Sequence, residues 1–196
     1  MDKLKTGIRR YRVDIFPKLK PKLEKLMTEG QRPEILVIAC SDSRIKLDEF
    51  TQCDPGDLFI VRNAGNIVPP WGVHPSGVAA SIEYAISVLP IRDVIIAGHT
   101  GCGAMGALCQ PHTIKDLPAV REWLNYAPVT MPCELNTESL ANVTRENVLL
   151  QVEHLREYPC VRDRVAAGKL RLYGWVYCIE TGEVLEHGKD GWHVID

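Results

Sequence analysis

The 196-residue sequence lacks the features that mark several specialised classes of protein. Its apolar runs, such as residues 35–40, are far shorter than the ~20 residues of a membrane-spanning helix. Basic and acidic residues nearly balance, at 23 against 25, so the positive excess typical of nucleic-acid-binding proteins is missing. We find no internal repeat and no low-complexity tract. These absences predict a protein with neither nucleic acid nor membrane among its partners.

The sequence also lacks a disulfide framework of the kind found in small secreted proteins. It contains seven cysteines, which is an odd number, and they are scattered without a secretory signal before them. We therefore expect a reducing, cytoplasmic location, where cysteines serve as core residues, metal ligands or nucleophiles. Apolar residues make up 45% and charged residues 24%, as in ordinary globular proteins, which excludes intrinsic disorder.

Short hydrophobic segments alternate with helical patterns along most of the chain. Three of them are continuously apolar, which is typical of strands buried on both faces of a parallel sheet. The predicted strands are residues 35–39, 58–61, 94–97, 170–178 and 183–187, and the predicted helices are residues 77–89, 101–108 and 137–158. This order predicts an α/β fold, with a mostly parallel central sheet of four strands plus a short edge strand, flanked by helices. We expect one domain over residues 1–196, with residues 127–136 as a surface loop.

Residues 1–30 predict an N-terminal helical arm. Apolar residues recur there at intervals of three and four, which is the spacing of one helix face. Pro17 and Pro21 favour two short helices over one long helix, and Gly30 is a plausible end. We expect the arm to lie against the body or against a partner subunit.

Chemically active residues follow two of the predicted parallel strands. The first strand leads into Cys40, Asp42 and Arg44, and the third leads into His99 and Cys102. Because parallel strands end at the same edge of a sheet, Cys40, His99 and Cys102 can converge. Two cysteines and a histidine suit zinc, and three protein ligands leave a fourth position open, as in catalytic zinc sites.

Asp42 and Arg44 extend this predicted site. Asp42 is placed either to bind the metal or to accept a hydrogen bond from a metal-bound water, and Arg44 is placed to pair with Asp42. Taken singly, each residue has a simpler interpretation: a cysteine at a strand end is often core, and a histidine in a turn is often a capping residue. The combination of the two motifs favours the metal site.

The two motifs resemble those of the β-class carbonic anhydrases. Residues 39–44 (Ala-Cys-Ser-Asp-Ser-Arg) and 98–103 (Gly-His-Thr-Gly-Cys-Gly) resemble the zinc motifs of that family. The segment 55–66, which begins Pro-Gly-Asp-Leu-Phe, and the segments 81–85 and 174–177 match it as well. The resemblance spans residues 31–182. Residues 117–124 are most similar to a bacterial branch that includes the carbonic anhydrases associated with cyanate degradation.

The resemblance implies a zinc-dependent lyase that reversibly hydrates CO2 to bicarbonate and a proton. One Zn2+ per subunit would be held by Cys40, His99 and Cys102, and zinc-bound hydroxide would be the nucleophile. The Asp42–Arg44 pair would orient that hydroxide. Val37 and Ala39 stand where members inhibited by bicarbonate carry Trp and Gly, so we predict no such inhibitory site.

The resemblance also implies substrate-binding residues and a partner. Phe59 and Tyr84 would line the CO2 pocket, and Gln31 would donate a hydrogen bond to a substrate oxygen. In the family these residues reach the site across a subunit interface, which implies a homodimer or a higher homo-oligomer such as a tetramer or octamer. Without the resemblance, all three residues would be interpreted as structural.

Three alternatives to CO2 hydration stay open on the sequence. The same pocket would suit hydrolysis of a CO2 analogue such as COS or CS2. A zinc-stabilised scaffold without turnover is a second alternative, although it would not need the Asp42–Arg44 pair. An enzyme with Cys40 as nucleophile is the third. The remaining cysteines have no chemical neighbours in the sequence and are predicted to be free thiols: Cys53, Cys109, Cys133, Cys160 and Cys178.

Overall fold

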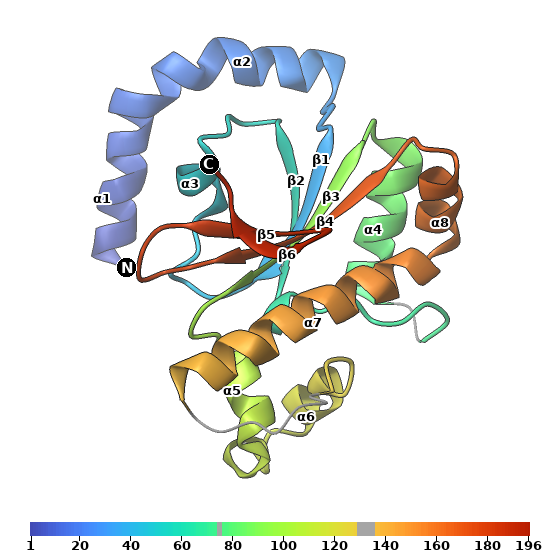
Figure 1. The fold of residues 1–196 in the computed structure, drawn as a ribbon. Helices are drawn as coiled ribbons and strands as arrows, with labels where there is room; N and C mark the ends of the chain where they lie inside the picture. Colours follow the sequence, from blue (N-terminus) through green and yellow to red (C-terminus); the bar gives the residue numbers. More distant parts are fainter. Residues whose placement is uncertain (74–75, 129–135) are drawn as a thin grey trace.

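The computed structural model describes residues 1–73, 76–128 and 136–196. These residues form a sheet of six strands in the order β2-β1-β3-β4-β5-β6 (Figure 1). The strands are β1 (Ile35–Cys40), β2 (Leu58–Asn63), β3 (Asp93–His99), β4 (Arg171–Tyr177), β5 (Val184–Gly188) and β6 (Gly191–Val194). The pairs β2·β1, β1·β3 and β3·β4 are parallel, whereas β5 and β6 join the edge in antiparallel pairs. The α/β fold with a mostly parallel sheet is thus confirmed.

Helices connect and cover the strands. They are α1 (Asp2–Arg10), α2 (Phe16–Glu29), α3 (Leu47–Thr51), α4 (Gly77–Val88), α5 (Gly103–Cys109), α6 (Pro118–Leu124), α7 (Thr137–Glu157) and α8 (Pro159–Ala166). Short turns of other helix types occupy Tyr11–Ile15, Ala64–Asn66 and Pro111–Ile114. No helix in the three described ranges is long and apolar enough to cross a membrane.

The central strands are apolar on both faces because each face is covered by other parts of the chain. On one face Leu36, Ile38 and Ile96 belong to the main core, together with apolar residues of α4, α7 and α8. On the other face Val37 and Ile95 belong to a smaller core that α3 covers. Since successive side chains of a strand point to opposite faces, continuous apolar runs are needed to fill both cores.

The edge of the sheet differs from the sequence prediction in one strand. The predicted edge strand is β5, but β6 pairs outside it, with Leu185 opposite Val194 and Gly188 opposite Gly191. The dipeptide Asp190-Gly191 is a hairpin-turn signal that would have indicated β6. Gly191 has a φ of 103°, a left-handed conformation that glycine adopts without steric cost.

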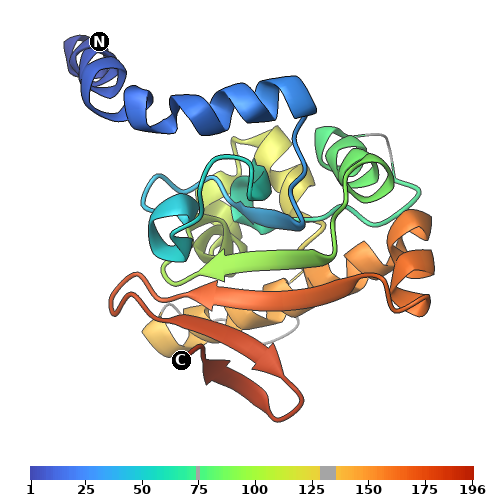
Figure 2. The same ribbon diagram turned by 90° about the horizontal axis from the view of Figure 1, so that it is seen from above.

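The N-terminal arm consists of α1 and α2, as predicted, and stands away from the body of the molecule (Figure 2). The two helices meet at the π-helical turn Tyr11–Ile15, with Pro17 in the first turn of α2. Pro21 was expected to interrupt the arm but lies inside α2, where it removes one backbone donor without ending the helix. Gly30 ends α2 with a φ of 81°, as predicted.

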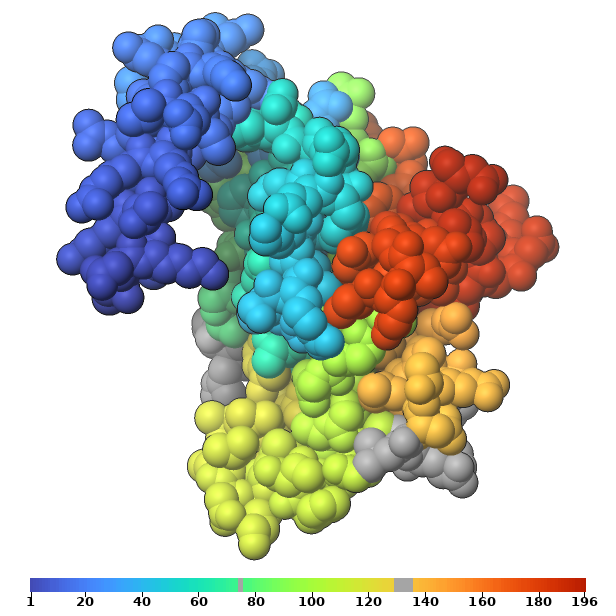
Figure 3. All heavy atoms as spheres, turned by 90° about the vertical axis from the view of Figure 1, so that its left-hand side faces the viewer, coloured from blue at the N-terminus to red at the C-terminus, as the bar shows by residue number. Residues whose placement is uncertain are grey.

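The apolar side of the arm has little to pack against within its own chain. Neither α1 nor α2 contains a buried residue, and Leu4, Ile8 and Val13 are more than half exposed. Figure 3 shows α1 projecting past the side of the body. Exposed apolar faces of this kind mark contact sites for other protein surfaces.

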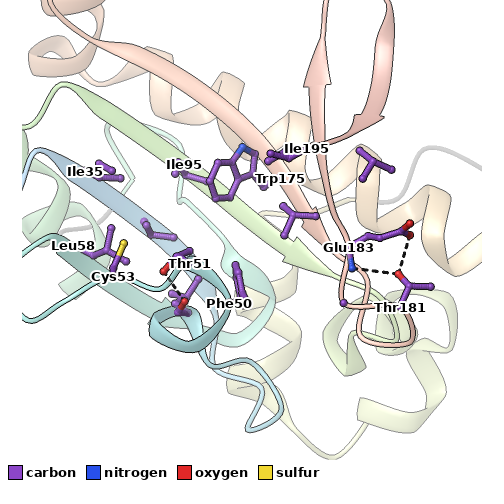
Figure 4. Close-up of a pocket in the computed structure, with 15 residues that line it drawn as sticks. Ile35, Phe50, Thr51, Cys53, Leu58, Ile95, Trp175, Thr181, Glu183 and Ile195 are labelled. Atoms are coloured by element: carbon purple, nitrogen blue, oxygen red, sulfur yellow. Dashed lines mark hydrogen bonds between the residues drawn. The ribbon is translucent and has the colours of Figure 1, made fainter.

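A hydrophobic groove of about 590 Å³ lies on the sheet face that α3 covers in part (Figure 4). Ile35, Ile95 and Trp175 form its floor on the sheet, and Phe50 and Ile195 line it from α3 and from the chain end. The groove lies on a different face of the sheet from α4, α7 and α8, and it contains none of the predicted metal ligands.

Candidate metal centre

The three predicted metal ligands converge at the carboxyl edge of the parallel strands. Cys40 is the last residue of β1, His99 is the last residue of β3, and Cys102 precedes α5 as its N-cap. Their ligand atoms all lie within 4.8 Å of one another, and each residue is at least 95% buried. β1 and β3 are neighbours in the sheet, so the convergence follows from their parallel pairing.

His99 is oriented as a metal ligand. Its Nδ1 lies 2.9 Å from the carbonyl oxygen of Thr100, so Nδ1 carries the proton and donates it there. Nε2 then has a free lone pair and, among the described residues, has no hydrogen-bond partner although it is buried. A buried ring nitrogen without a partner is costly unless a ligand satisfies it, and metal-binding histidines share this arrangement of a donating second nitrogen.

The two cysteine sulfurs are spaced as a metal ion requires. Their Sγ atoms are 3.9 Å apart, and sulfurs bound tetrahedrally to one zinc at about 2.3 Å would lie roughly 3.8 Å apart. A hydrogen bond from the Cys102 thiol is the largest cause that lowers the pKa of Cys40 well below its usual value. The same interaction and burial raise the pKa of Cys102. The donor set therefore fits zinc, with one sulfur already favouring the thiolate form.

Asp42 and Arg44 form a tight ion pair beside these ligands. Arg44 donates from Nε to Oδ1 of Asp42 at 2.9 Å and from Nη2 to Oδ2 at 2.8 Å. Nη2 also donates to the carbonyl of Gly101 at 2.9 Å, which ties the pair to the turn between His99 and Cys102. These bonds hold the pKa of Asp42 well below its usual range, and its Oδ2 lies 3.9 Å from Nε2 of His99. A carboxylate oxygen thus lies beside the ligand set.

The predicted substrate residues lie apart from the metal centre within one chain. Phe59 pairs with Leu36, four residues before Cys40, so about 13 Å of strand separates it from the ligands. Tyr84 lies near Phe59, with ring centroids 6.1 Å apart, and Gln31 is an exposed residue after α2. The structure therefore brings Cys40, His99, Cys102, Asp42 and Arg44 together and leaves the other three elsewhere.

Residues that the sequence did not indicate support the ligands. Arg62 donates to the carbonyl oxygens of Cys40 and Asp42, at 2.8 to 3.0 Å, and so fixes the chain between them. The backbone of Gly65 contributes to the lowered pKa of the Cys40 thiol. Both belong to the segment 55–66 that matched the family. A sequence motif does not show which backbone atoms its residues contact, so these roles could not be predicted.

The expectation of free thiols is wrong for one cysteine. Cys109 is disulfide-bonded, whereas Cys53, Cys160 and Cys178 are free, as expected. Cys133 lies outside the described residues, as do residues 129–135 of the predicted surface loop. Sequence spacing between cysteines does not show which sulfurs meet in the fold, which is why the pairing of Cys109 was missed.

Comparison with known proteins places this centre in a family. The sequence pattern of the family described as carbonic anhydrase matches residues 35–184. A carbonic anhydrase of Synechococcus elongatus is 43% identical over 194 residues, covering 95% of this chain and 71% of the relative. A carbonic anhydrase of Pseudomonas aeruginosa is 42% identical over 184 residues, covering 91% and 83%.

Solved structures agree with the sequence comparison. The β-carbonic anhydrase CcaA superposes with a TM-score of 0.94 at 35% identity, covering 100% of this chain and 92% of that one. A tetrameric β-carbonic anhydrase of Sordaria macrospora gives a TM-score of 0.66 at 28% identity, covering 95% and 93%. The ligand geometry, the sheet and these relatives agree, and the chain belongs to the carbonic anhydrase family, in its β-class.

Proposed function

We propose that this enzyme hydrates CO2 reversibly to bicarbonate and a proton, at one zinc ion held by Cys40, His99 and Cys102. The observation that carries the proposal is the unpartnered Nε2 of buried His99, which shares one site with two cysteine sulfurs. Three protein ligands would leave a fourth position for catalysis, and the Asp42 carboxylate, 3.9 Å from Nε2 of His99, would lie next to it. A scaffold with a purely structural zinc would not need that carboxylate.

The chain supplies orientation, and the metal supplies the nucleophile. Zinc would lower the pKa of its bound water far below that of bulk water, to about 7, so that hydroxide forms near neutral pH. Asp42 is ionised and acts only as an acceptor, so it would accept a hydrogen bond from the nucleophile and orient it toward the CO2 carbon. Arg44 would keep the carboxylate in this orientation through its two parallel bonds.

The substrate pocket would be completed by a second copy of the chain. Gln31, Phe59 and Tyr84 lie away from the metal ligands of their own chain, as a contribution to a partner's site requires. The exposed apolar side of the arm would pack against the partner, and the groove of Figure 4 offers an apolar surface for such a contact. A homodimer is the smallest assembly that satisfies this arrangement, and the tetrameric relative from Sordaria macrospora supports a homo-oligomer.

Stopped-flow CO2 hydration combined with metal analysis tests the proposed reaction. The wild-type enzyme should contain one zinc per subunit and be active. Cys102→Ser should lose both metal and activity, whereas Asp42→Asn should keep the metal and lose most activity. Cys160→Ser provides the matched control, because Cys160 is a free, half-buried cysteine of α8 and should retain both. A metal-free wild-type protein, or full activity in Cys102→Ser, would overturn the proposal.

Hetero-oligomers test whether the active site is shared between subunits. Gln31→Ala and Cys102→Ser should each be nearly inactive as homo-oligomers, one lacking the substrate donor and the other the metal. When the two variants are co-expressed with different tags and purified through both, one site per dimer should combine a complete ligand set with a native Gln31. Activity well above that of either homo-oligomer is expected. No gain in the mixed assembly would exclude a shared site and leave the metal chemistry unaffected.

A further inference from the structure

Thr100 lies between two of the proposed ligands, and its carbonyl is the group that His99 contacts. Nδ1 of His99 lies 2.9 Å from that carbonyl oxygen. A metal-binding imidazole keeps its direction when the group that accepts from its other nitrogen is itself held in place. Whatever holds the Thr100 carbonyl therefore also helps to determine where Nε2 of His99 points.

Thr100 is bound by the segment that connects β4 to β5. Its N–H donates to the carbonyl of Tyr177, the last residue of β4, at 3.0 Å, which continues the pairing of β3 with β4. Its hydroxyl accepts from the N–H of Ile179 at 3.0 Å and donates to Oε2 of Glu180 at 2.6 Å. The backbone and the side chain of Thr100 are thus both anchored on the same connection.

Glu180 is the charged member of this set. Its side chain is exposed, and the bond from the Thr100 hydroxyl is the largest cause that lowers the pKa of Glu180 below its ordinary value. An ionised carboxylate only accepts, and it forms shorter and stronger hydrogen bonds than a neutral acceptor does. Glu180 therefore determines the direction of the hydroxyl hydrogen and leaves an oxygen lone pair of Thr100 for the N–H of Ile179.

The anchors of Thr100 restrict its carbonyl as well as its side chain. The amide nitrogen and Cβ are both bonded to Cα, so once the two are held, the bond from Cα to the carbonyl carbon has one direction. Rotation about that bond turns the planar peptide group that joins Thr100 to Gly101. Arg44 limits this rotation, because its Nη2 donates to the carbonyl of Gly101 at 2.9 Å. The Thr100 carbonyl therefore lies between two anchored positions.

We propose that Thr100 and Glu180 are positioning residues of the metal centre: the Thr100 hydroxyl, fixed by Glu180, holds in place the residue whose carbonyl orients His99. The inference rests on the proposed metal-dependent function. It adds an anchor on the connection between β4 and β5 to the one that Arg44 provides from the loop after β1. Loss of an outer hydrogen bond of a metal ligand typically costs about 10–100-fold in metal affinity or activity.

The same connection contains a second threonine–glutamate pair, which provides a matched control. The hydroxyl of Thr181 donates to Oε2 of Glu183 at 2.8 Å and accepts from the N–H of Glu183 at 3.3 Å. Both bonds stay within the connection. Substitutions in this pair therefore measure what the loss of such a bond does to the connection itself.

Zinc affinity, measured by competition with a chelator, tests the role without reference to activity. Thr100→Val keeps the shape of the side chain and removes both hydroxyl bonds, so it should bind zinc about 10-fold more weakly or worse. Thr100→Ser restores the hydroxyl and should recover most of the affinity. Thr181→Val should bind zinc as the wild type does. Wild-type affinity in Thr100→Val, or equal loss in Thr181→Val, would overturn the inference.

The Nδ1 proton of His99 gives a signature that a general loss of stability would not reproduce. In zinc-loaded, ¹⁵N-labelled protein, this proton should exchange with water faster in Thr100→Val than in the wild type, because its acceptor is less firmly held. The rate should be unchanged in Thr181→Val. Exchange at the wild-type rate in Thr100→Val would contradict the positioning role.

Glu180→Ala covers the case in which Thr100→Val does not fold, since Glu180 is exposed. It should show weaker zinc binding and faster exchange of the His99 proton, and Glu183→Ala should show neither. If Glu180→Ala matches the wild type in both measurements, the inference fails while zinc binding and activity of the wild type still support the proposed function. A wild-type protein that binds no zinc would instead refute the proposed function.

Discussion

Arg44 donates two parallel hydrogen bonds to the carboxylate of Asp42, and the same guanidinium donates to the carbonyl of Gly101. The pair thereby joins the loop after β1 to the turn after β3, which are the two chain segments that carry the proposed metal ligands. One arginine thus sets the orientation of the carboxylate relative to His99 and Cys102. The ammonium group of a lysine could not form these two parallel hydrogen bonds, because it lacks the planar, two-pronged geometry of a guanidinium.

Replacement of Arg44 by lysine should show whether activity depends on the positive charge at this position or on the two parallel hydrogen bonds to Asp42. Arg44→Lys keeps the positive charge but cannot form the two parallel bonds, so Asp42 is free to rotate. We expect kcat/KM for CO2 hydration to fall by about 10-fold or more at unchanged zinc content. Stopped-flow assays and metal analysis measure both. Arg162→Lys is the control, because Arg162 pairs with Asp163 at an exposed site and should behave as wild type. Wild-type kinetics in Arg44→Lys would show that charge alone suffices.

The acidity of Asp42 predicts a pH window. Hydrogen bonds from Arg44 hold its pKa in the folded state below its ordinary value of 3.8. The stability that the pair contributes is therefore complete above that value and is lost as pH falls through the lower folded value. The difference in unfolding free energy between wild type and Asp42→Asn should be constant from about pH 5 to 8 and shrink in stronger acid. Denaturant unfolding of the metal-free proteins measures it.

The low pKa of Asp42 also predicts how CO2 hydration depends on pH. Since Asp42 stays ionised near neutral pH, its protonation should produce no step in the pH profile between about pH 5 and 8. Val37 and Ala39 also predict that bicarbonate does not inhibit cooperatively. A steep, cooperative loss of CO2 hydration just below neutral pH, deepened by added bicarbonate, would contradict both expectations.

A side chain at Gly98 should destabilise the protein because α7 crosses β3 at this residue. A Cβ there would lie 2.6 Å from Val148 Cγ2 and 3.2 Å from Thr144 Cγ2. We expect Gly98→Ala to lower the free energy of unfolding by about 1–3 kcal/mol, as overpacking does. Val148→Ala should restore part of the loss in the double variant, since it removes the clashing methyl group. Urea unfolding measures each variant.

Gly106 provides the matched control for Gly98. It lies in α5, and an added Cβ would have no atom within 4 Å. Gly106→Ala should therefore stabilise the protein by up to about 1 kcal/mol, because alanine favours the helix. Equal destabilisation by both substitutions would show that the crossing of α7 over β3 is looser than the structure indicates.

Tyr158 should make stability depend on alkaline pH. Burial raises its pKa to about 12, and its hydroxyl donates to the carbonyl of Pro69. The neutral form is favoured in the fold, so this contribution is intact below the ordinary value of 10.0 and is lost as pH rises toward 12. The stability difference between wild type and Tyr158→Phe, about 1 kcal/mol at pH 8, should decline over that window. A difference independent of pH up to 12 would argue against a buried hydroxyl.

Much of the fold was predictable because the strongest signals are local. The continuous apolar runs identify β1 and β3 as central strands, and Gly30 ends α2 as expected. Pro21 shows the limit of such rules, since one missing donor did not end α2. The strand β6 was missed because it is short, with little hydrophobic signal of its own, and because the Asp190-Gly191 turn signal before it was overlooked.

The sequence alone determined which side chains are able to bind a metal, since Cys40, His99 and Cys102 follow two strands whose parallel pairing brings their ends together. Only the tertiary structure decided which distant residues hold the segment that follows β2. Asn147 and Gly65 are 82 residues apart, and a pattern along the chain does not encode which carbonyl a helix side chain will meet. That contact arises from the packing of α7 across the sheet, where shape and hydrogen-bond geometry are settled together.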